Sequence, residues 1–212
     1  MSDWTCGAGR RVSLMASLLL FLLAGGQPPA APRDEPGAGP RAGTQAATQP
    51  AEGADMKLTV KSTAFAEGQV IPKKYTGEGQ DVSPPLSWSG LPAETKELAL
   101  ICDDPDAPRA EPWVHWVIYK IPAAAAGLPE NVARTEKVRE PAGALQGKNS
   151  WGKIGYGGPM PPPGHGVHHY HFKLYALDAA LEVPGGLTKD ELVKRMKGHV
   201  LAEGELIGTY RR

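Results

Sequence analysis

Two separated segments of the sequence contain the side chains that could do chemistry. The first is Asp103 to Pro108 (DDPDAP), followed closely by Trp113 to Trp116 (WVHW). The second is Gly157 to Tyr170, which combines many glycines and prolines with histidine and a final tyrosine. Carboxylate, imidazole and phenol groups that meet in one pocket could bind an anion, because an imidazolium and a hydroxyl both donate hydrogen bonds.

Strand alternation predicts which of these side chains point inward. Side chains of successive strand residues point to opposite faces, so residues two apart share a face. On this basis, four side chains lie on apolar faces near strand ends: Asp104, His115, His168 and Tyr170. His115 should share its face with Trp113, Val117 and Tyr119, while His169 and His171 should face solvent.

Burial of these groups has an energetic consequence. A buried carboxylate or imidazole costs several kcal/mol unless it is paired. We therefore expect Asp104 to hold a histidine, to raise the pKa of that histidine and to keep it cationic towards a bound anion. Each motif on its own also has a simpler interpretation. The DDPD segment would then be an ordinary turn, and His115 would be a histidine of the core.

The elements that must position these residues are mainly strands. Short segments with a side-chain pattern of period two predict strands. These segments are Lys57 to Phe65, Glu97 to Asp104, Trp113 to Lys120, His168 to Leu177 and Glu205 to Tyr210. The 26 glycines and 21 prolines interrupt the chain too often for long helices. The predicted fold class is mainly β: an antiparallel Greek-key β-sandwich with one or two small peripheral helices.

The helices are predicted from local signals. Thr188 with Glu191 has the spacing of a capping box, and the apolar pattern after it continues through Leu201 until Gly204. A second short helix is possible at residues 123–126, before Gly127.

The N-terminal part predicts export. Arg10 and Arg11 precede an apolar run from Val12 to Ala24, which indicates a signal peptide at residues 1–26. That run is shorter than the roughly 20 residues needed to span a bilayer. The alternative to a signal peptide is a buried N-terminal helix. Residues 27–55 are rich in Pro, Ala and Gly and predict a disordered linker, so residues 56–212 form the folded domain. We expect a periplasmic or secreted protein that meets the membrane only through its transient signal peptide.

Charge and cysteine content restrict the possible partners. The chain has 23 Lys and Arg against 23 Asp and Glu, with no basic stripe, so we do not expect nucleic-acid binding. Cys102 is the one cysteine of the predicted domain, so the fold must be held by packing without an intramolecular disulfide.

Together the motifs resemble the phosphatidylethanolamine-binding protein family, which includes Raf kinase inhibitor protein, and above all its bacterial members. The similarity covers residues 56–212 and is carried by DVSPPLSWSGLP at 81–92, DPDAP at 104–108, WVHW at 113–116, NSWGKIGYGGPMPPPG at 149–164 and VHHYHFKLYALD at 167–178. The resemblance implies a β-sandwich with a pocket for phosphate-like anions. The implied ligand-binding residues are Asp104, Asp106, Pro108, Trp113, His115, Pro162, His168 and Tyr170. One departure is His169, where many members carry arginine.

The functional hypothesis is therefore non-enzymatic binding of a small anionic or phosphorylated ligand, without a cofactor or metal, with possible regulation of a protein partner. One alternative is a metal-dependent hydrolase using Asp104, Asp106, His115 and His168. Another is an inhibitor of a protease or kinase that docks through the segment from Pro141 to Trp151.

Overall fold

The computed structural model describes residues 57–212. The predicted signal peptide and linker lie outside these described residues. Within residues 57–212, none of the helices has the length and apolar character needed to cross a membrane.

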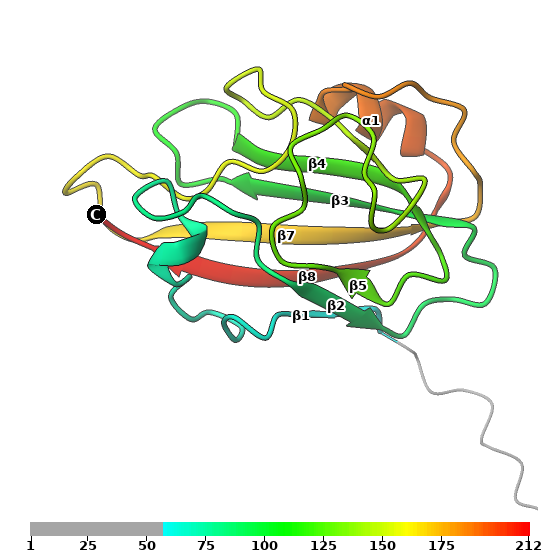
Figure 1. Ribbon diagram of the computed structural model, residues 1–212, viewed down its shortest axis with the longest axis horizontal. Helices are drawn as coiled ribbons and strands as arrows, with labels where there is room; N and C mark the ends of the chain where they lie inside the picture. Colours follow the sequence, from blue (N-terminus) through cyan, green and yellow to red (C-terminus); the bar gives the residue numbers. More distant parts are fainter. Residues whose placement is uncertain (1–56) are drawn as a thin grey trace, which may run out of the picture. The chain divides into compact units, whose positions relative to one another are not determined.

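Two antiparallel sheets form the domain, and Figure 1 shows the smaller one lying along one side of the larger. The five-stranded sheet has the order β6-β4-β3-β7-β8. Its strands are β3 (Glu97–Asp104), β4 (Trp113–Pro122), β6 (Leu145–Gln146), β7 (His168–Leu177) and β8 (Val200–Tyr210). The three-stranded sheet has the order β1-β2-β5, with β1 (Thr59–Lys61), β2 (Leu86–Ser89) and β5 (Gly127–Leu128). The predicted mainly β antiparallel fold is confirmed.

The central strand β3 is buried on both faces. Leu98, Leu100 and Cys102 pack into the core between the two sheets. Ala99 and Ile101 pack on the opposite face, into a second cluster with Leu192 and Met196 of helix α1 (Lys189–Met196). A strand covered on both sides reads as a continuous apolar run, which is what this segment shows.

The predicted secondary-structure elements need correction at three points. Helix α1 begins at the predicted capping box of Thr188, but it ends at Met196 and not near Gly204. After Gly198, whose φ is 85°, the chain turns and residues 200–210 pair with β7 as strand β8. Residues 123–126 form a turn before β5, and a short 3-10 helix, η1 (Lys73–Tyr75), occurs instead. The first predicted strand is reduced to the three residues of β1.

An irregularity in β4 changes the orientation of His115. Cys102 pairs with Trp116 and Asp103 pairs with Val114, so His115 is an extra residue between two regular pairs. Such a β-bulge interrupts the alternation of side chains and often re-aims one of them beside a functional site. The prediction that His115 shares a face with Val117 and Tyr119 is therefore wrong. Those two pack in the cluster under α1, whereas His115 lines a pocket at the end of the sheet.

Gly204 of β8 packs closely against Leu58, the residue before β1, and this contact predicts the effect of a substitution on stability. A Cβ added to Gly204 would lie 2.5 Å from the backbone oxygen of Leu58, which a rotamer change cannot relieve. We expect Gly204→Ala to lower the free energy of unfolding by about 1–3 kcal/mol, as overpacking does. The exposed neighbour provides the control, since Glu203→Ala should stay within about 0.5 kcal/mol in the same urea titrations. Equal effects of the two substitutions would contradict this account of the glycine.

Candidate functional site

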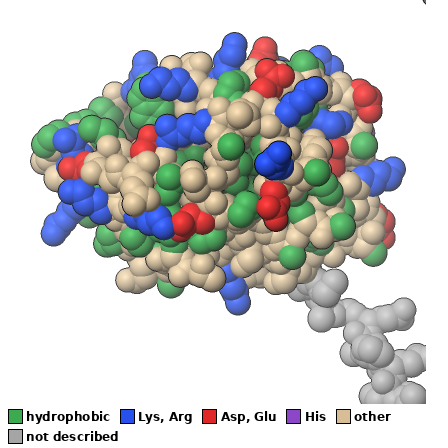
Figure 2. All heavy atoms as spheres, in the orientation of Figure 1, with side chains coloured by type: hydrophobic (Ala, Val, Ile, Leu, Met, Phe, Trp, Pro, Cys, Tyr) green, Lys and Arg blue, Asp and Glu red, His purple; other side chains and the backbone are tan. Residues whose placement is uncertain are grey.

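A pocket of about 240 Å³ opens where β3 ends and where β4 and β7 begin. It is lined by Asp104, Ala107, Pro108, Arg109, Trp113, His115, Trp151, Met160, Pro161, Pro162, His168 and Tyr170. Seven of the eight residues predicted from the sequence thus come together, and Asp106 does not. Figure 2 shows hydrophobic and basic side chains next to one another at the end of the domain where the chain terminates in Figure 1. Exposed Met160 belongs to the loop that leads into β7.

Asp104 anchors the floor of the pocket. One carboxylate oxygen accepts a hydrogen bond from the backbone N–H of Asp106 at 2.9 Å. The other is 2.7 Å from Nδ1 of His168, and both side chains are almost fully buried. Because a carboxylate is an acceptor, Nδ1 of His168 carries a proton. This is the predicted carboxylate–histidine pair.

The second ring nitrogen of His168, Nε2, is also in contact with another side chain. This nitrogen is 2.8 Å from Nδ1 of His165, a residue that the sequence prediction passed over. His165 stands between two glycines with positive φ, Gly164 and Gly166, and this backbone lets the loop fold back over the strand end. The result is a hydrogen-bonded chain from Asp104 through His168 to His165.

His115 is the histidine that remains available to a ligand. Its Nδ1 lies 2.6 Å from the carbonyl oxygen of Gly157, so Nδ1 carries the proton. Its Nε2 makes no hydrogen bond within residues 57–212 and is a lone-pair acceptor when the ring is neutral. Burial lowers the pKa of His115 to about 4, against the weaker effects of the Gly157 hydrogen bond and nearby carboxylates, which raise it. The pairing of Asp104 thus falls on His168, and His115 is neutral near pH 7.

Tyr170 places an unpaired hydroxyl in the pocket. Its ring packs edge-on against His115, with the centroids 5.0 Å apart. Among the described residues, its oxygen is the one buried side-chain polar atom without a hydrogen-bond partner. Burial, followed by the neighbouring Asp104 charge, raises the pKa of this phenol well above its usual value, so the hydroxyl remains a donor. A buried donor without a partner is rare in folded proteins and calls for a ligand or a water molecule.

Arg109 and Trp151 complete the walls, and the sequence analysis missed both. The guanidinium of Arg109 lies over the ring of Trp113, 4.6 Å from its centroid. Trp151 packs edge-on against Trp113 and also against His115. The position of Arg109 directly after DPDAP could have suggested a role in the site. The local sequence does not show, however, that the turn brings this side chain back to the end of the strand.

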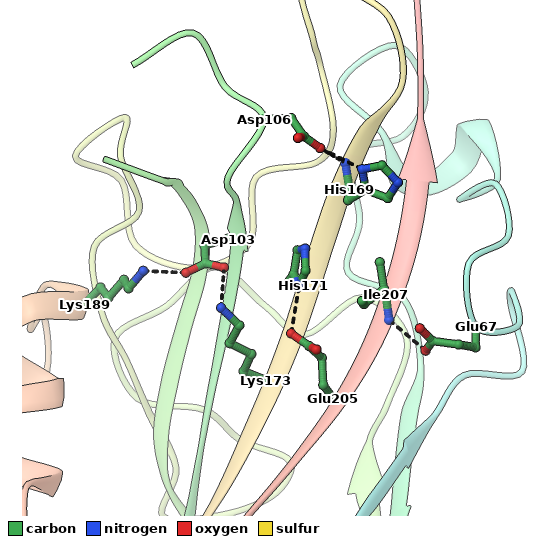
Figure 3. A network of polar contacts seen from close by, with 9 residues as sticks. All are labelled: Glu67, Asp103, Asp106, His169, His171, Lys173, Lys189, Glu205 and Ile207. Carbon is green, nitrogen blue, oxygen red and sulfur yellow. Dashed lines mark hydrogen bonds and ion pairs between the residues drawn. The ribbon is translucent and has the colours of Figure 1, made fainter. Parts of the chain in front are cut away.

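Asp106 lies on the outer face of the sheet and not in the pocket. Its carboxylate accepts from the backbone N–H of His169 and lies 2.7 Å from Nδ1 of the same residue. Figure 3 shows this pair at the end of a row of polar contacts that continues with His171 and Glu205. Asp103 contacts Lys173 and Lys189 in the same view. His169 thus occupies the exposed face that strand alternation predicted, and it uses Asp106 as its partner.

Neither alternative function gains support from this geometry. Among residues 57–212, no group of three or more His, Cys, Asp or Glu side chains is arranged to hold a metal ion. The proposed docking segment, Pro141 to Trp151, is partly built into the fold. Its Gln146 is fully buried, where it accepts from Nε1 of Trp116 and donates to two backbone carbonyls.

Comparisons with known proteins agree with the fold and the motifs. The sequence profile described as "Phosphatidylethanolamine-binding protein" matches residues 61–211. A UPF0098 protein of Methanothermobacter thermautotrophicus is 51% identical over 155 residues, covering 73% of this chain and 99% of the relative. A UPF0098 protein of Pyrococcus horikoshii is 47% identical over 161 residues, covering 76% of this chain and 80% of the relative.

Solved structures give the same result. The crystal structure of a putative phosphatidylethanolamine-binding protein homolog from Chlamydia trachomatis is 40% identical, with a TM-score of 0.67, and the match covers 74% of this chain and 99% of that one. The structure of E. coli YbcL, described as a new member of the mammalian family, is 33% identical, with a TM-score of 0.69 and the same coverage. This chain belongs to the phosphatidylethanolamine-binding protein family.

Proposed function

We propose that the pocket binds a small oxyanion, such as free phosphate or the phosphate of an esterified headgroup, without catalysing a reaction on it. The observation that carries this proposal is the buried hydroxyl of Tyr170, a donor that has no partner among the described residues. An unsatisfied buried polar group costs about 1–3 kcal/mol, and an anionic oxygen placed against it would recover that cost.

The neighbouring groups support binding over nucleophilic chemistry. Both oxygens of Asp104 are already engaged, by His168 and by the backbone of Asp106. No Ser, Thr, Cys or Lys side chain from residues 57–212 lines the pocket. Towards a ligand, the Tyr170 hydroxyl is a donor and the His115 Nε2 is an acceptor for a protonated oxygen. Proline and tryptophan side chains form the apolar walls.

Thermal melting with and without ligand tests the proposal. We expect inorganic phosphate and phosphoethanolamine to raise the melting temperature, because a ligand at one hundred times its Kd stabilises the folded state by about 2.7 kcal/mol. Tyr170→Phe removes only the hydroxyl and should weaken phosphate binding about tenfold, the equivalent of one hydrogen bond.

The same substitution has an opposite expected effect on the free protein. Removing an unsatisfied buried hydroxyl should leave the stability of the unliganded Tyr170→Phe variant equal to or higher than that of the native chain. Tyr175→Phe, on the other face of β7, is the matched control and should change neither quantity. Melting temperatures that do not respond to either ligand, or equal phosphate affinity of Tyr170→Phe and the native chain, would refute the proposal.

A further inference from the structure

We propose that Arg109 is the residue that makes this pocket selective for anions. The inference rests on the proposed anion binding and assigns the charge on which that binding depends. Neither the DPDAP motif nor the segment containing His168 and Tyr170 includes this arginine.

The charges of the pocket show why such a residue is needed. Asp104 contributes a negative charge, and a protonated His168 would no more than balance it, since the two are hydrogen-bonded to each other. His115 adds no charge as long as Nδ1 donates to Gly157 and Nε2 keeps its lone pair. Without another cation, the pocket would present an anion with a neutral or negative surface. Of the lining residues, all within the described chain, Arg109 alone carries a permanent positive charge.

Contacts of Arg109 leave its hydrogen-bond donors free. Within residues 57–212, Arg109 has no ion-pair partner, whereas Arg134 pairs with Asp81 and Arg212 with Glu78. Its one aromatic contact places the guanidinium carbon over the ring of Trp113, 4.6 Å from the centroid. This contact supplies no oxygen acceptor, so the N–H groups can form two parallel hydrogen bonds to a phosphate or carboxylate.

The local backbone holds Arg109 at the pocket mouth. The Asp104 carboxylate fixes the start of the turn through the backbone N–H of Asp106, and the N–H of Arg109 donates to the carbonyl of Ala107. The cation is therefore positioned before a ligand arrives, which reduces the entropy lost on binding. Because the loop follows Asp104 directly, the same carboxylate organises the floor and the cationic side of the pocket.

Isothermal titration of the full chain with inorganic phosphate at low ionic strength tests the inference. We expect Arg109→Gln to weaken phosphate binding about tenfold or more, the effect of losing charge-assisted hydrogen bonds. Arg109→Lys keeps the charge but not the planar fork, so its affinity should lie between those of Arg109→Gln and the native chain. Arg139→Gln makes the same change of charge at an exposed position outside the pocket and should leave the affinity unchanged.

A second readout separates charge from structure. Phosphate affinity of the native chain should fall as salt is added, and this salt dependence should be much smaller for Arg109→Gln. Melting temperatures without phosphate should be equal for all four proteins, because Arg109 and Arg139 are exposed. If the native chain binds phosphate and Arg109→Gln binds it equally well, the role of Arg109 is refuted while the proposed function stands. If the native chain binds no phosphate, both are refuted.

Discussion

Asp104→Ala should lower the free energy of unfolding by about 3–5 kcal/mol, the usual cost of removing one partner from a buried, hydrogen-bonded pair of ionisable side chains. The carboxylate has two roles that no neighbour can replace. It accepts from Nδ1 of His168 deep in the protein, and it accepts from the backbone of Asp106 at the start of the turn. Alanine would leave His168 with a buried, unpaired N–H and the turn without its hydrogen bond. Urea unfolding followed by circular dichroism measures the change.

Two related substitutions make this prediction specific. Asp106→Ala removes the same chemical group two residues later, but its pair with His169 is exposed, so the loss should be within about 1 kcal/mol. Asp104→Asn keeps one carbonyl oxygen and turns the other acceptor into a donor, so its stability should lie between those of Asp104→Ala and the native chain. A cost for Asp104→Ala no larger than that for Asp106→Ala would show that the buried pair does not stabilise the fold.

The sequence predicted the fold class because local patterns and tertiary contacts agree over most of the domain. Strand β3 is buried on both faces, and its unbroken apolar run is already visible in the sequence. The pattern failed where local and tertiary preferences compete. Val200 and Leu201 continue the apolar spacing of helix α1, yet they belong to β8. Val200 pairs with Leu177 at the end of β7, a complete strand that lies more than twenty residues earlier in the chain.

The site was predictable to the extent that it depends on alternation within single strands. Asp104, His168 and Tyr170 follow the alternation of β3 and β7 and meet in the pocket as expected. The surroundings of His115 were not predictable, because a β-bulge is a property of the pairing between two strands. Arg109 and His165 lie in loops, where the backbone path and not a period of two decides which side chains return to the site.

His115 gives the second large effect, which appears on acidification. Its pKa of about 4 in the folded protein lies below the ordinary value of 6.5 that the unfolded chain retains. Between these two values the unfolded chain binds more protons, so this residue contributes stability that is complete above pH 6.5 and is lost as the pH falls towards 4. The loss should reach about 3 kcal/mol, at about 1.4 kcal/mol for each unit of pKa difference. His115→Gln cannot titrate, so the loss of stability between pH 6.5 and 4 should be smaller in that variant by this amount.

Phosphate binding should also depend on pH, because the ligand contacts the same nitrogen of His115 that takes up the proton. A phosphate dianion would place an oxygen without a proton against the lone pair of His115 Nε2, which is repulsive. The complex therefore needs one proton, either on the phosphate oxygen or on His115.

Phosphate esters have a second pKa of about 6, so the affinity for phosphoethanolamine should fall about tenfold for each pH unit above that value. Titrations in buffers of different ionisation enthalpy at pH 8 should show uptake of about one proton per site. The amide of His115→Gln can donate to the dianion, so its affinity should vary little between pH 6 and 8. A native chain whose affinity for phosphoethanolamine is the same at pH 6 and pH 8 would rule out this role for a neutral His115.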